Sequence, residues 1–219
     1  MIKAAFFDFN GTLYFDQDIN KVTWKETIDN LSNNQIDFEK FFVKYRSVMD
    51  YIVIQDAFKL INHNYTQEEV QYWVNYKEDR YRQYGLDHKR TVLPSGAINV
   101  LNYLKSKNIP MILCTASIID NVEYYYKYFN LSSWFNFNQT VYDTGEYNGK
   151  LEMYLECAKR LNVNIKDAIV FEDSAIPIKE CISAGCQKVV AIKRQDTPNL
   201  PEIKLVIEDY LNFDYTVFD

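Results

Sequence analysis

Four short segments of the chain carry side chains that could do chemistry together. They are Asp8-Phe9-Asn10-Gly11-Thr12-Leu13, Thr115-Ala116-Ser117, Gly149-Lys150 and Glu172-Asp173-Ser174. Each has a plain structural explanation when it is taken alone, since an aspartate after a strand often forms a turn or caps a helix. The stretch 145–150 also fails as a nucleotide-binding phosphate loop, because it is one residue short and is followed by Leu151. Any shared role therefore depends on the elements that position the four segments.

Apolar runs precede three of these segments. The runs lie at Ile2–Phe7, Met111–Cys114 and Ala168–Phe171, with two more at Val189–Ile192 and near Leu205–Ile207. Nearly continuous apolarity over such short stretches is typical of strands that are buried on both faces of a parallel sheet. Ligands of open α/β sheets bind beyond the carboxyl ends of the strands. We therefore expect the carboxylates, the hydroxyl groups and the lysine to meet at one edge of such a sheet.

Amphipathic segments alternate with these runs and predict helices on both sides of the sheet. Three of them show a clear apolar face, formed by Ala97, Val100, Leu101 and Leu104, by Ile118, Val122, Tyr125 and Phe129, and by Leu151, Leu155, Ala158 and Leu161.

A long helical block interrupts this pattern. The chain has only six glycines and five prolines, and residues 12–84 contain neither. Apolar residues in this block recur with the helical period, and Thr66 with Glu69 fits a capping box at the start of its last helix. We predict an α/β fold in which a Rossmann-like parallel-sheet core, residues 1–15 and 91–219, carries an inserted four-helix cap, residues 16–90.

Composition excludes several classes of protein. The 24 Lys+Arg against 30 Asp+Glu give a formal charge of −6, without a basic stripe, which argues against a nucleic-acid partner. No apolar run is long enough to span a membrane, and the first residues lack the basic and small-residue features of a secretion signal. Four cysteines without a Cys-x-x-Cys pair favour reduced thiols. We expect a cytoplasmic, monomeric protein.

In order and spacing, the four segments resemble the motifs of the haloacid dehalogenase (HAD) superfamily. The helical insertion after the first strand, with Trp24 early in it, resembles the cap of the phosphoglucomutase-like phosphatase branch. The resemblance implies a phosphatase of a small phosphorylated metabolite, in which Asp8 attacks phosphorus and forms an aspartyl-phosphate. It also implies a Mg²⁺ ion held by oxygen atoms of Asp8, Asn10 (backbone), Glu172 and Asp173. The phosphoryl group would be bound by Thr115, Ala116, Ser117 and Lys150.

Asn10 departs from this pattern. Most phosphatases that the chain resembles have an aspartate here, which protonates the leaving alcohol and then activates water. An amide can do neither, and general acid–base catalysis is typically worth about 10²–10⁴-fold. We therefore expect a slow enzyme whose activity rises in Asn10→Asp. Asn10 can also stabilise the turn before Gly11.

Three alternative functions remain open. The first is a phosphosugar mutase, for which the resemblance implies a histidine at the position of Asn20. Arg46 is an uncertain match to the phosphate-binding arginine of such mutases. A 2-haloacid dehalogenase also lacks aspartate at position 10 but needs no Mg²⁺, whereas the Glu172-Asp173 pair argues for a metal. The third alternative is a catalytically weak phosphate-binding protein.

Lys77 interrupts an apolar helical face in the block. It either extends along the edge of that face to reach water or contacts substrate in the cleft between cap and core, where the resemblance places a lysine.

Overall fold

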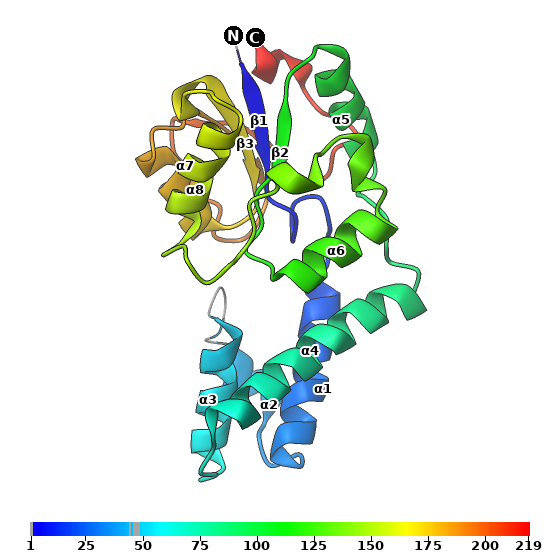
Figure 1. The fold of residues 1–219 in the computed structure, drawn as a ribbon, viewed down its shortest axis with the longest axis vertical. Helices are drawn as coiled ribbons and strands as arrows, with labels where there is room; N and C mark the ends of the chain where they lie inside the picture. Colours follow the sequence, from blue (N-terminus) through cyan, green and yellow to red (C-terminus); the bar gives the residue numbers. More distant parts are fainter. Residues whose placement is uncertain (1, 44, 46–48) are drawn as a thin grey trace. The chain divides into compact units, whose positions relative to one another are not determined.

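A single parallel sheet forms the centre of the larger part of the protein (Figure 1). The computed structural model describes residues 2–43, 45 and 49–219. Its sheet has the order β2-β1-β3-β4-β5, with β1 (Ala4–Phe7), β2 (Met111–Leu113), β3 (Ala168–Glu172), β4 (Lys188–Ile192) and β5 (Ile203–Ile207). These strands are the five apolar runs of the sequence, so the predicted α/β class is confirmed. Phe7 pairs with Leu113 on one side and with Phe171 on the other, which brings the ends of three strands to the same level.

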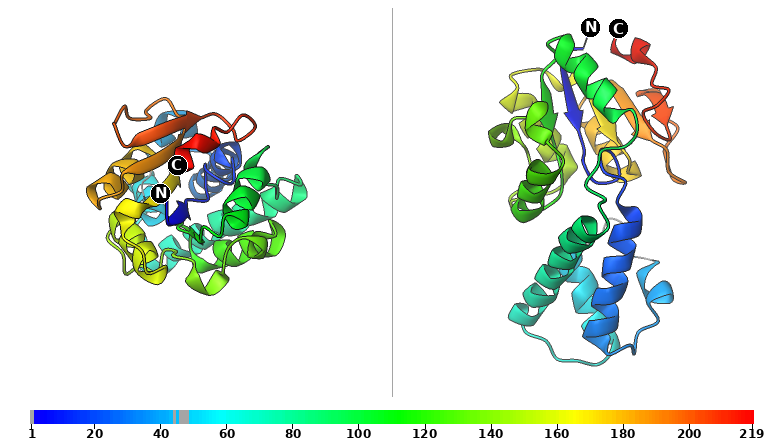
Figure 2. Two further views of the ribbon diagram at one scale, coloured as in Figure 1. Left: turned by 90° about the horizontal axis from the view of Figure 1, so that it is seen from above. Right: turned by 90° about the vertical axis from the view of Figure 1, so that its right-hand side faces the viewer.

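Helices cover both faces of this sheet (Figures 1 and 2). The helices are α5 (Ala97–Ser106), α6 (Ile119–Tyr128), α7 (Lys150–Arg160) and α8 (Ala175–Ser183), with short 3-10 turns η1 (Leu131–Ser133), η2 (Phe137–Gln139), η3 (Ile165–Asp167) and η4 (Tyr215–Phe218). Side chains of α7 and α8 share a buried cluster with Ala4 and Phe6 of β1. On the opposite face, Phe171 of β3 lies against Phe218 of η4, and the ring of Phe218 stacks on Tyr103 of α5.

Helix α7 is turned differently from the expectation. Its buried side chains are Lys150, Met153, Tyr154, Cys157 and Ala158, whereas Leu155 of the expected face is 44% exposed. The reason is that Lys150 and Tyr154, one helical turn apart, find polar partners inside the protein. The apolar pattern alone could not predict the burial of Lys150, because a lysine in such a pattern is assigned to the surface.

The chain divides into two compact units, described separately below. One consists of Met1–Asp16 with Thr91–Asp219 and contains the sheet, and the other is Gln17–Arg90. The expected boundary lay one residue earlier, between residues 15 and 16. Asp16 belongs with the sheet unit because its carboxylate accepts hydrogen bonds from Asn10 and Gly11.

The unit Gln17–Arg90 is helical throughout its described elements. They are α1 (Gln17–Ser32), α2 (Phe38–Phe42), α3 (Asp50–Leu60) and α4 (Gln67–Asp87). A buried apolar cluster joins them, with Trp24 and Ile28 from α1 and Ile54 and Phe58 from α3. The predicted capping box is present, since Thr66 and Glu69 exchange side-chain to backbone hydrogen bonds at the start of α4.

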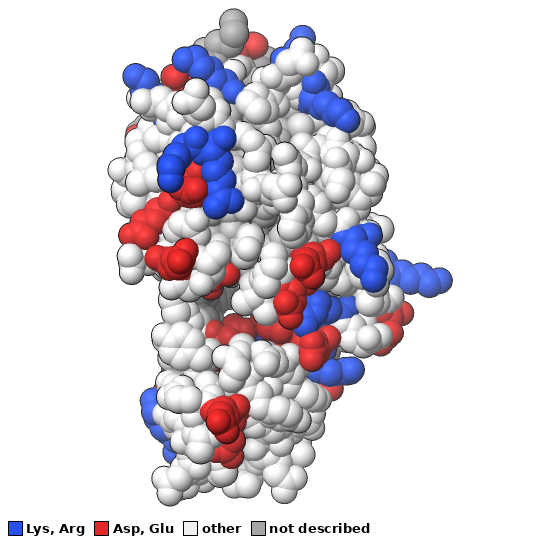
Figure 3. All heavy atoms as spheres, viewed as in Figure 1, with Lys and Arg blue, Asp and Glu red and all other residues white. Residues whose placement is uncertain are grey.

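The surface mixes charges of both signs. On the face drawn in Figure 3, Lys and Arg lie interspersed with Asp and Glu. Among the described residues, no helix combines the length and the apolar composition that crossing a membrane requires. All four cysteines are free and buried.

Candidate active site

Asp8 follows β1 directly and is buried at the edge of the sheet. Only 5% of the Asp8 surface is exposed to solvent. Thr12 donates a hydrogen bond from Oγ1 to Asp8 Oδ2 at 3.0 Å, and Lys150 donates from Nζ to Asp8 Oδ1 at 2.7 Å. The two contacts hold the carboxylate in one orientation while it remains largely out of water.

Lys150 reaches this point from the first residue of α7. Gly149, with φ of 148°, lies immediately before the helix. Besides Asp8, the Lys150 ammonium group donates to the Cys114 carbonyl oxygen at 2.6 Å and lies 3.7 Å from Glu172 Oε2. The negative groups around it raise the pKa of Lys150 despite its burial, so that the side chain is positively charged at neutral pH.

Glu172 and Asp173 stand at the end of β3. The Tyr154 hydroxyl of α7 donates to Glu172 Oε2 at 2.7 Å. Asp173 accepts from Ser174 Oγ at 2.8 Å and from Arg194 Nε at 3.0 Å. One carboxylate oxygen from each of Asp8, Glu172 and Asp173 lies within 4.8 Å of the other two. The sheet edge thus gathers three acidic side chains from two adjacent strands.

Burial shapes the ionisation of these groups. Loss of solvent raises the pKa of Asp8 to about 6; Lys150 opposes this shift and Asp173 adds to it. Burial, followed by repulsion from Asp8, raises the pKa of Glu172 well above its ordinary value. The three crowded carboxylates form a set of hard oxygen ligands, and they outnumber the two cationic side chains beside them, Lys150 and Arg194. The residues present therefore fit a divalent cation such as Mg²⁺, which Asp8, Glu172 and Asp173 could hold; a fourth ligand from the backbone carbonyl of Asn10 stays a prediction.

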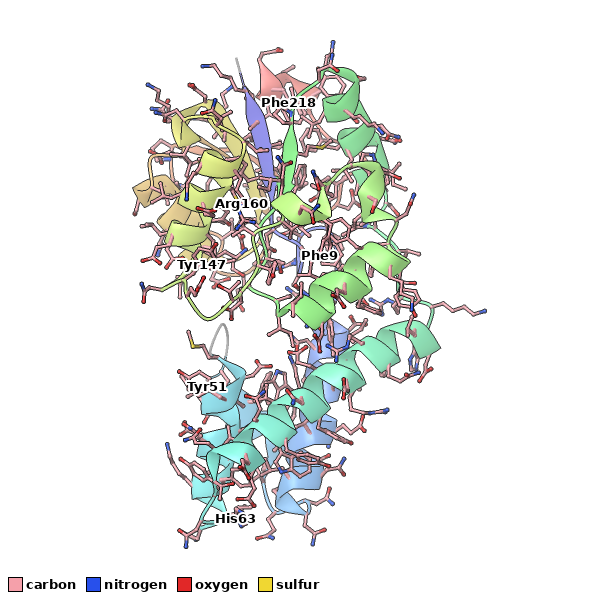
Figure 4. All side chains as sticks on the ribbon, in the orientation of Figure 1. Phe9, Tyr51, His63, Tyr147, Arg160 and Phe218 are labelled. Carbon is pink, nitrogen blue, oxygen red and sulfur yellow. The ribbon has the colours of Figure 1, made fainter. Side chains whose placement is uncertain are left out.

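Asn10 lies in a dense polar network. Its side-chain nitrogen donates to Asp16 Oδ2 at 2.7 Å and to the Tyr125 hydroxyl at 2.9 Å. Its side-chain oxygen accepts from Ser117 Oγ at 2.8 Å and from Thr115 Oγ1 at 3.3 Å. Phe9, labelled in Figure 4, packs its ring on Tyr125 of α6 with centroids 4.1 Å apart. This contact helps to hold the tyrosine against the loop.

The segment after β2 supplies hydroxyl groups to the same place. Thr115 is buried, and its Oγ1 accepts a hydrogen bond from the Ser117 backbone nitrogen at 3.2 Å. Ala116 lies between them and is exposed. The sheet unit therefore contains every site residue expected from the sequence except Lys77. Asp8, Lys150, Glu172 and Asp173 lie close to one another, and Asn10, Thr115 and Ser117 form a second set of contacts.

Lys77 lies in α4 of the other unit and is itself paired. Its Nζ is 2.8 Å from Glu78 Oε1 and 3.2 Å from Asp50 Oδ2, and the side chain is 6% exposed. It therefore does not extend to water at the edge of the helix, and a substrate contact by Lys77 stays a prediction. Asn20, in α1, has a buried Oδ1 with no hydrogen-bond partner among the described residues. Arg46 lies outside the described residues.

Sequence reasoning missed several residues of the site. Thr12, Tyr154 and Arg194 contact Asp8, Glu172 and Asp173 respectively, and Asp16 and Tyr125 contact Asn10. Arg194, which follows β4, also donates from Nη2 to the Gly11 carbonyl oxygen at 2.6 Å. Thr12 and Asp16 are close to Asp8 in the sequence and could have been suspected for that reason. Nothing in the local sequence around Arg194 indicates that it reaches back to the first loop.

Comparison with known proteins shows which family and fold the chain resembles. The family model of haloacid dehalogenase-like hydrolases matches residues 2–185. A comparison with curated protein sequences found no match. Among solved structures, a HAD hydrolase of family IA, variant 3, from Entamoeba histolytica is 27% identical, with a TM-score of 0.84, and the alignment covers 99% of this chain and 97% of that one.

Two further structures share the fold at lower identity. The β-phosphoglucomutase of Clostridium difficile is 22% identical, with a TM-score of 0.77 over 99% of this chain and 95% of that one. A mutant of CbbY from Rhodobacter sphaeroides in complex with xylulose-1,5-bisphosphate is 15% identical, with a TM-score of 0.76 over 100% of both chains. The match of the family model over most of the chain, together with the parallel sheet, shows that the protein belongs to the haloacid dehalogenase-like hydrolases.

Proposed function

We propose that the protein is a Mg²⁺-dependent phosphatase that hydrolyses a phosphoric monoester of a small metabolite through an aspartyl-phosphate. One observation carries the proposal. The Asp8 carboxylate is desolvated, oriented by Thr12 and Lys150, and grouped with Glu172 and Asp173 at the sheet edge. A nucleophile and a set of metal ligands thereby occupy one site.

The chemistry follows from these positions. An oxygen of Asp8 attacks the phosphorus, the bond to the leaving alkoxide breaks, and the alcohol is released after it gains a proton. Water then attacks the aspartyl-phosphate, which returns Asp8 and releases inorganic phosphate. Lys150 stabilises negative charge on the phosphoryl oxygens, and the hydroxyl groups of Thr115 and Ser117 are hydrogen-bond donors for them. A bound Mg²⁺ ion would offset the repulsion between an anionic nucleophile and an anionic substrate.

Asn10 limits the rate of this reaction. Its amide neither gives a proton to the leaving oxygen nor takes one from water. The leaving group must then depart with a proton from solvent, and activated esters should react faster than sugar phosphates. Because β-phosphoglucomutase and a xylulose-bisphosphate complex of CbbY share the fold, phosphorylated sugars are the first natural substrates to test.

The test compares the wild type with Asp8→Asn, in Mg²⁺ and in EDTA. The substrates are p-nitrophenyl phosphate, a panel of sugar phosphates and 2-haloacids. We expect Mg²⁺-dependent phosphate release by the wild type and none by Asp8→Asn, with ³²P from labelled substrate found on the peptide that contains Asp8 after acid quenching. The exposed Asp120→Asn is the matched control and should retain full activity. Halide release without metal would identify a dehalogenase, and phosphate binding without turnover would identify a binding protein.

A further inference from the structure

Asp16 holds a buried carboxylate against the loop that carries Asn10. It is 3% exposed. One oxygen, Oδ2, accepts from Asn10 Nδ2 at 2.7 Å, and the other, Oδ1, accepts from the Gly11 backbone nitrogen at 3.0 Å. Each oxygen of the carboxylate therefore serves a different donor of the same turn.

These contacts determine which way the Asn10 amide points. An ionised carboxylate only accepts hydrogen bonds, so the NH₂ end of the amide must face Asp16. The oxygen end then faces three hydroxyl groups, those of Ser117, Tyr125 and Thr115, at 2.8, 3.2 and 3.3 Å. Hydroxyl groups can donate or accept, so they adapt to either orientation of the amide, and Asp16 alone among these partners cannot.

We propose that Asp16 positions the side chain of Asn10. Positions 10 and 16 then form a matched pair of one amide and one carboxylate, of which only the carboxylate is charged. The carboxylate of Asp16 then supplies, next to Asn10, the negative charge that position 10 itself lacks. Asp16 turns the Asn10 oxygen toward Thr115 and Ser117, the hydroxyl groups assigned above to the phosphoryl group. The activity part of this inference rests on the proposed function, whereas the pairing does not.

The pairing changes the expectation for single substitutions. In Asn10→Asp, a carboxylate oxygen replaces the nitrogen that lies 2.7 Å from Asp16 Oδ2, so two like charges meet in a buried site. In Asp16→Asn, the new asparagine still accepts from Gly11 but donates toward position 10, so the Asn10 amide turns over and its nitrogen faces the hydroxyl groups instead. The double variant Asn10→Asp/Asp16→Asn restores every one of these contacts. The new asparagine donates to position 10 and accepts from Gly11, while the three hydroxyl groups donate to the new aspartate.

The experiment is a double-mutant cycle measured by thermal unfolding in EDTA at pH 7.5. We expect Asn10→Asp to lower Tm by about 5–10 °C, because two carboxylates then face each other, and Asp16→Asn by no more than about 2 °C, because the Asn10 amide can turn over. The double variant should lie within about 2 °C of the wild type, so the two shifts should not add. The matched control swaps the same residue types at Asn164 and Asp214, exposed caps of η3 and η4 that do not contact each other, and its two shifts should add. Shifts that add at positions 10 and 16 as well would overturn the pairing.

Kinetics separate a positioning role from a purely structural one. With p-nitrophenyl phosphate and Mg²⁺, we expect kcat of the double variant to exceed that of the wild type by at least about 10-fold, with KM within about threefold, because a carboxylate at position 10 acts only in the transition state. Asn10→Asp alone should fall short of this gain. A double variant that recovers Tm but not kcat would reduce the pair to a structural contact. Inactivity of every variant, with Tm still coupled, would instead overturn the proposed phosphatase. Intact mass must show that Asn10 has not deamidated.

Discussion

Replacement of Asp8 by asparagine should make the metal-free protein more stable. Asp8 is buried, and the loss of solvent raises its pKa from 3.8 to about 6 even though Lys150 lies 2.7 Å away. The folded protein therefore holds the Asp8 proton more tightly than the unfolded chain does. The amide introduced by Asp8→Asn carries no charge, yet it can accept from Lys150 through its oxygen and donate to Thr12 through its nitrogen.

The size and the sign of the effect follow from linkage. Between pH 3.8 and about 6, the folded state binds more protons than the unfolded state, so the free energy of unfolding falls as the pH rises through this window. The rise of the Asp8 pKa from 3.8 to about 6, at about 1.36 kcal/mol for each pKa unit, amounts to about 3 kcal/mol above pH 7. At pH 5 about half of this penalty has developed. Asp8→Asn should remove the penalty and gain about 1–3 kcal/mol at pH 7.5.

Urea unfolding in EDTA between pH 5 and pH 8 measures this directly. The gain of Asp8→Asn over the wild type should grow with pH across this range, while Asp120→Asn, at the exposed start of α6, should show no such gain. Added Mg²⁺ should stabilise the wild type more than Asp8→Asn, because the variant lacks one anionic ligand. A variant that is less stable than the wild type in EDTA at pH 7.5, or a gain that does not vary with pH, would refute the claim that buried Asp8 is held at an energetic cost.

Two further predictions test the elements around Asp8. In Gly11→Ala, the new Cβ would lie 2.2 Å from Asp173 Oδ2 at a φ of +79°, whereas in Gly145→Ala it would meet open space at a nearly equal φ of +77°. Both variants should lose about 1–2 kcal/mol of stability because of the backbone conformation. Calorimetric titration should show weaker Mg²⁺ binding for Gly11→Ala alone. Lys150→Met should lose about 3–5 kcal/mol in urea unfolding at pH 7.5, since it strands the buried Asp8 carboxylate, and the loss should shrink toward pH 5 as that carboxylate gains a proton.

Under the proposed function, burial of Asp8 lowers stability locally and serves the chemistry. A carboxylate with raised pKa and little hydration would attack phosphorus without first losing an ordered water shell. Stability lost at such a site is a common feature of enzymes. The same crowding of Asp8 with Glu172 and Asp173 makes a divalent cation favourable, so metal binding and stability are expected to rise together.

The strand ends illustrate how far the sequence could go. Apolar runs located the strands, and the rule that ligands bind at carboxyl ends predicted that Asp8, Thr115 and Glu172 would lie near one another. The register of β1 with its two neighbours produces that result. Hydrophobic periodicity failed on α7, because it could not weigh the partners available to Lys150 and Tyr154. It also could not predict the contact of Arg194 with Asp173, since 21 residues and a whole strand separate the two.

By itself the sequence determined the elements, their order and the chemical groups at the end of each strand, because these depend on local patterns of apolarity and on short motifs. It also showed that position 10 holds an amide. Only the tertiary structure decided what that amide faces, since the meeting of Asn10 with Asp16, Tyr125 and Ser117 depends on the path of a tight loop and on the packing of α6 against it. Asn10, which lacks the acid group usual at this position, has the Asp16 carboxylate 2.7 Å from its side-chain nitrogen. Hydrogen-bond direction, which no pattern of residue types encodes, explains why the two residues belong together.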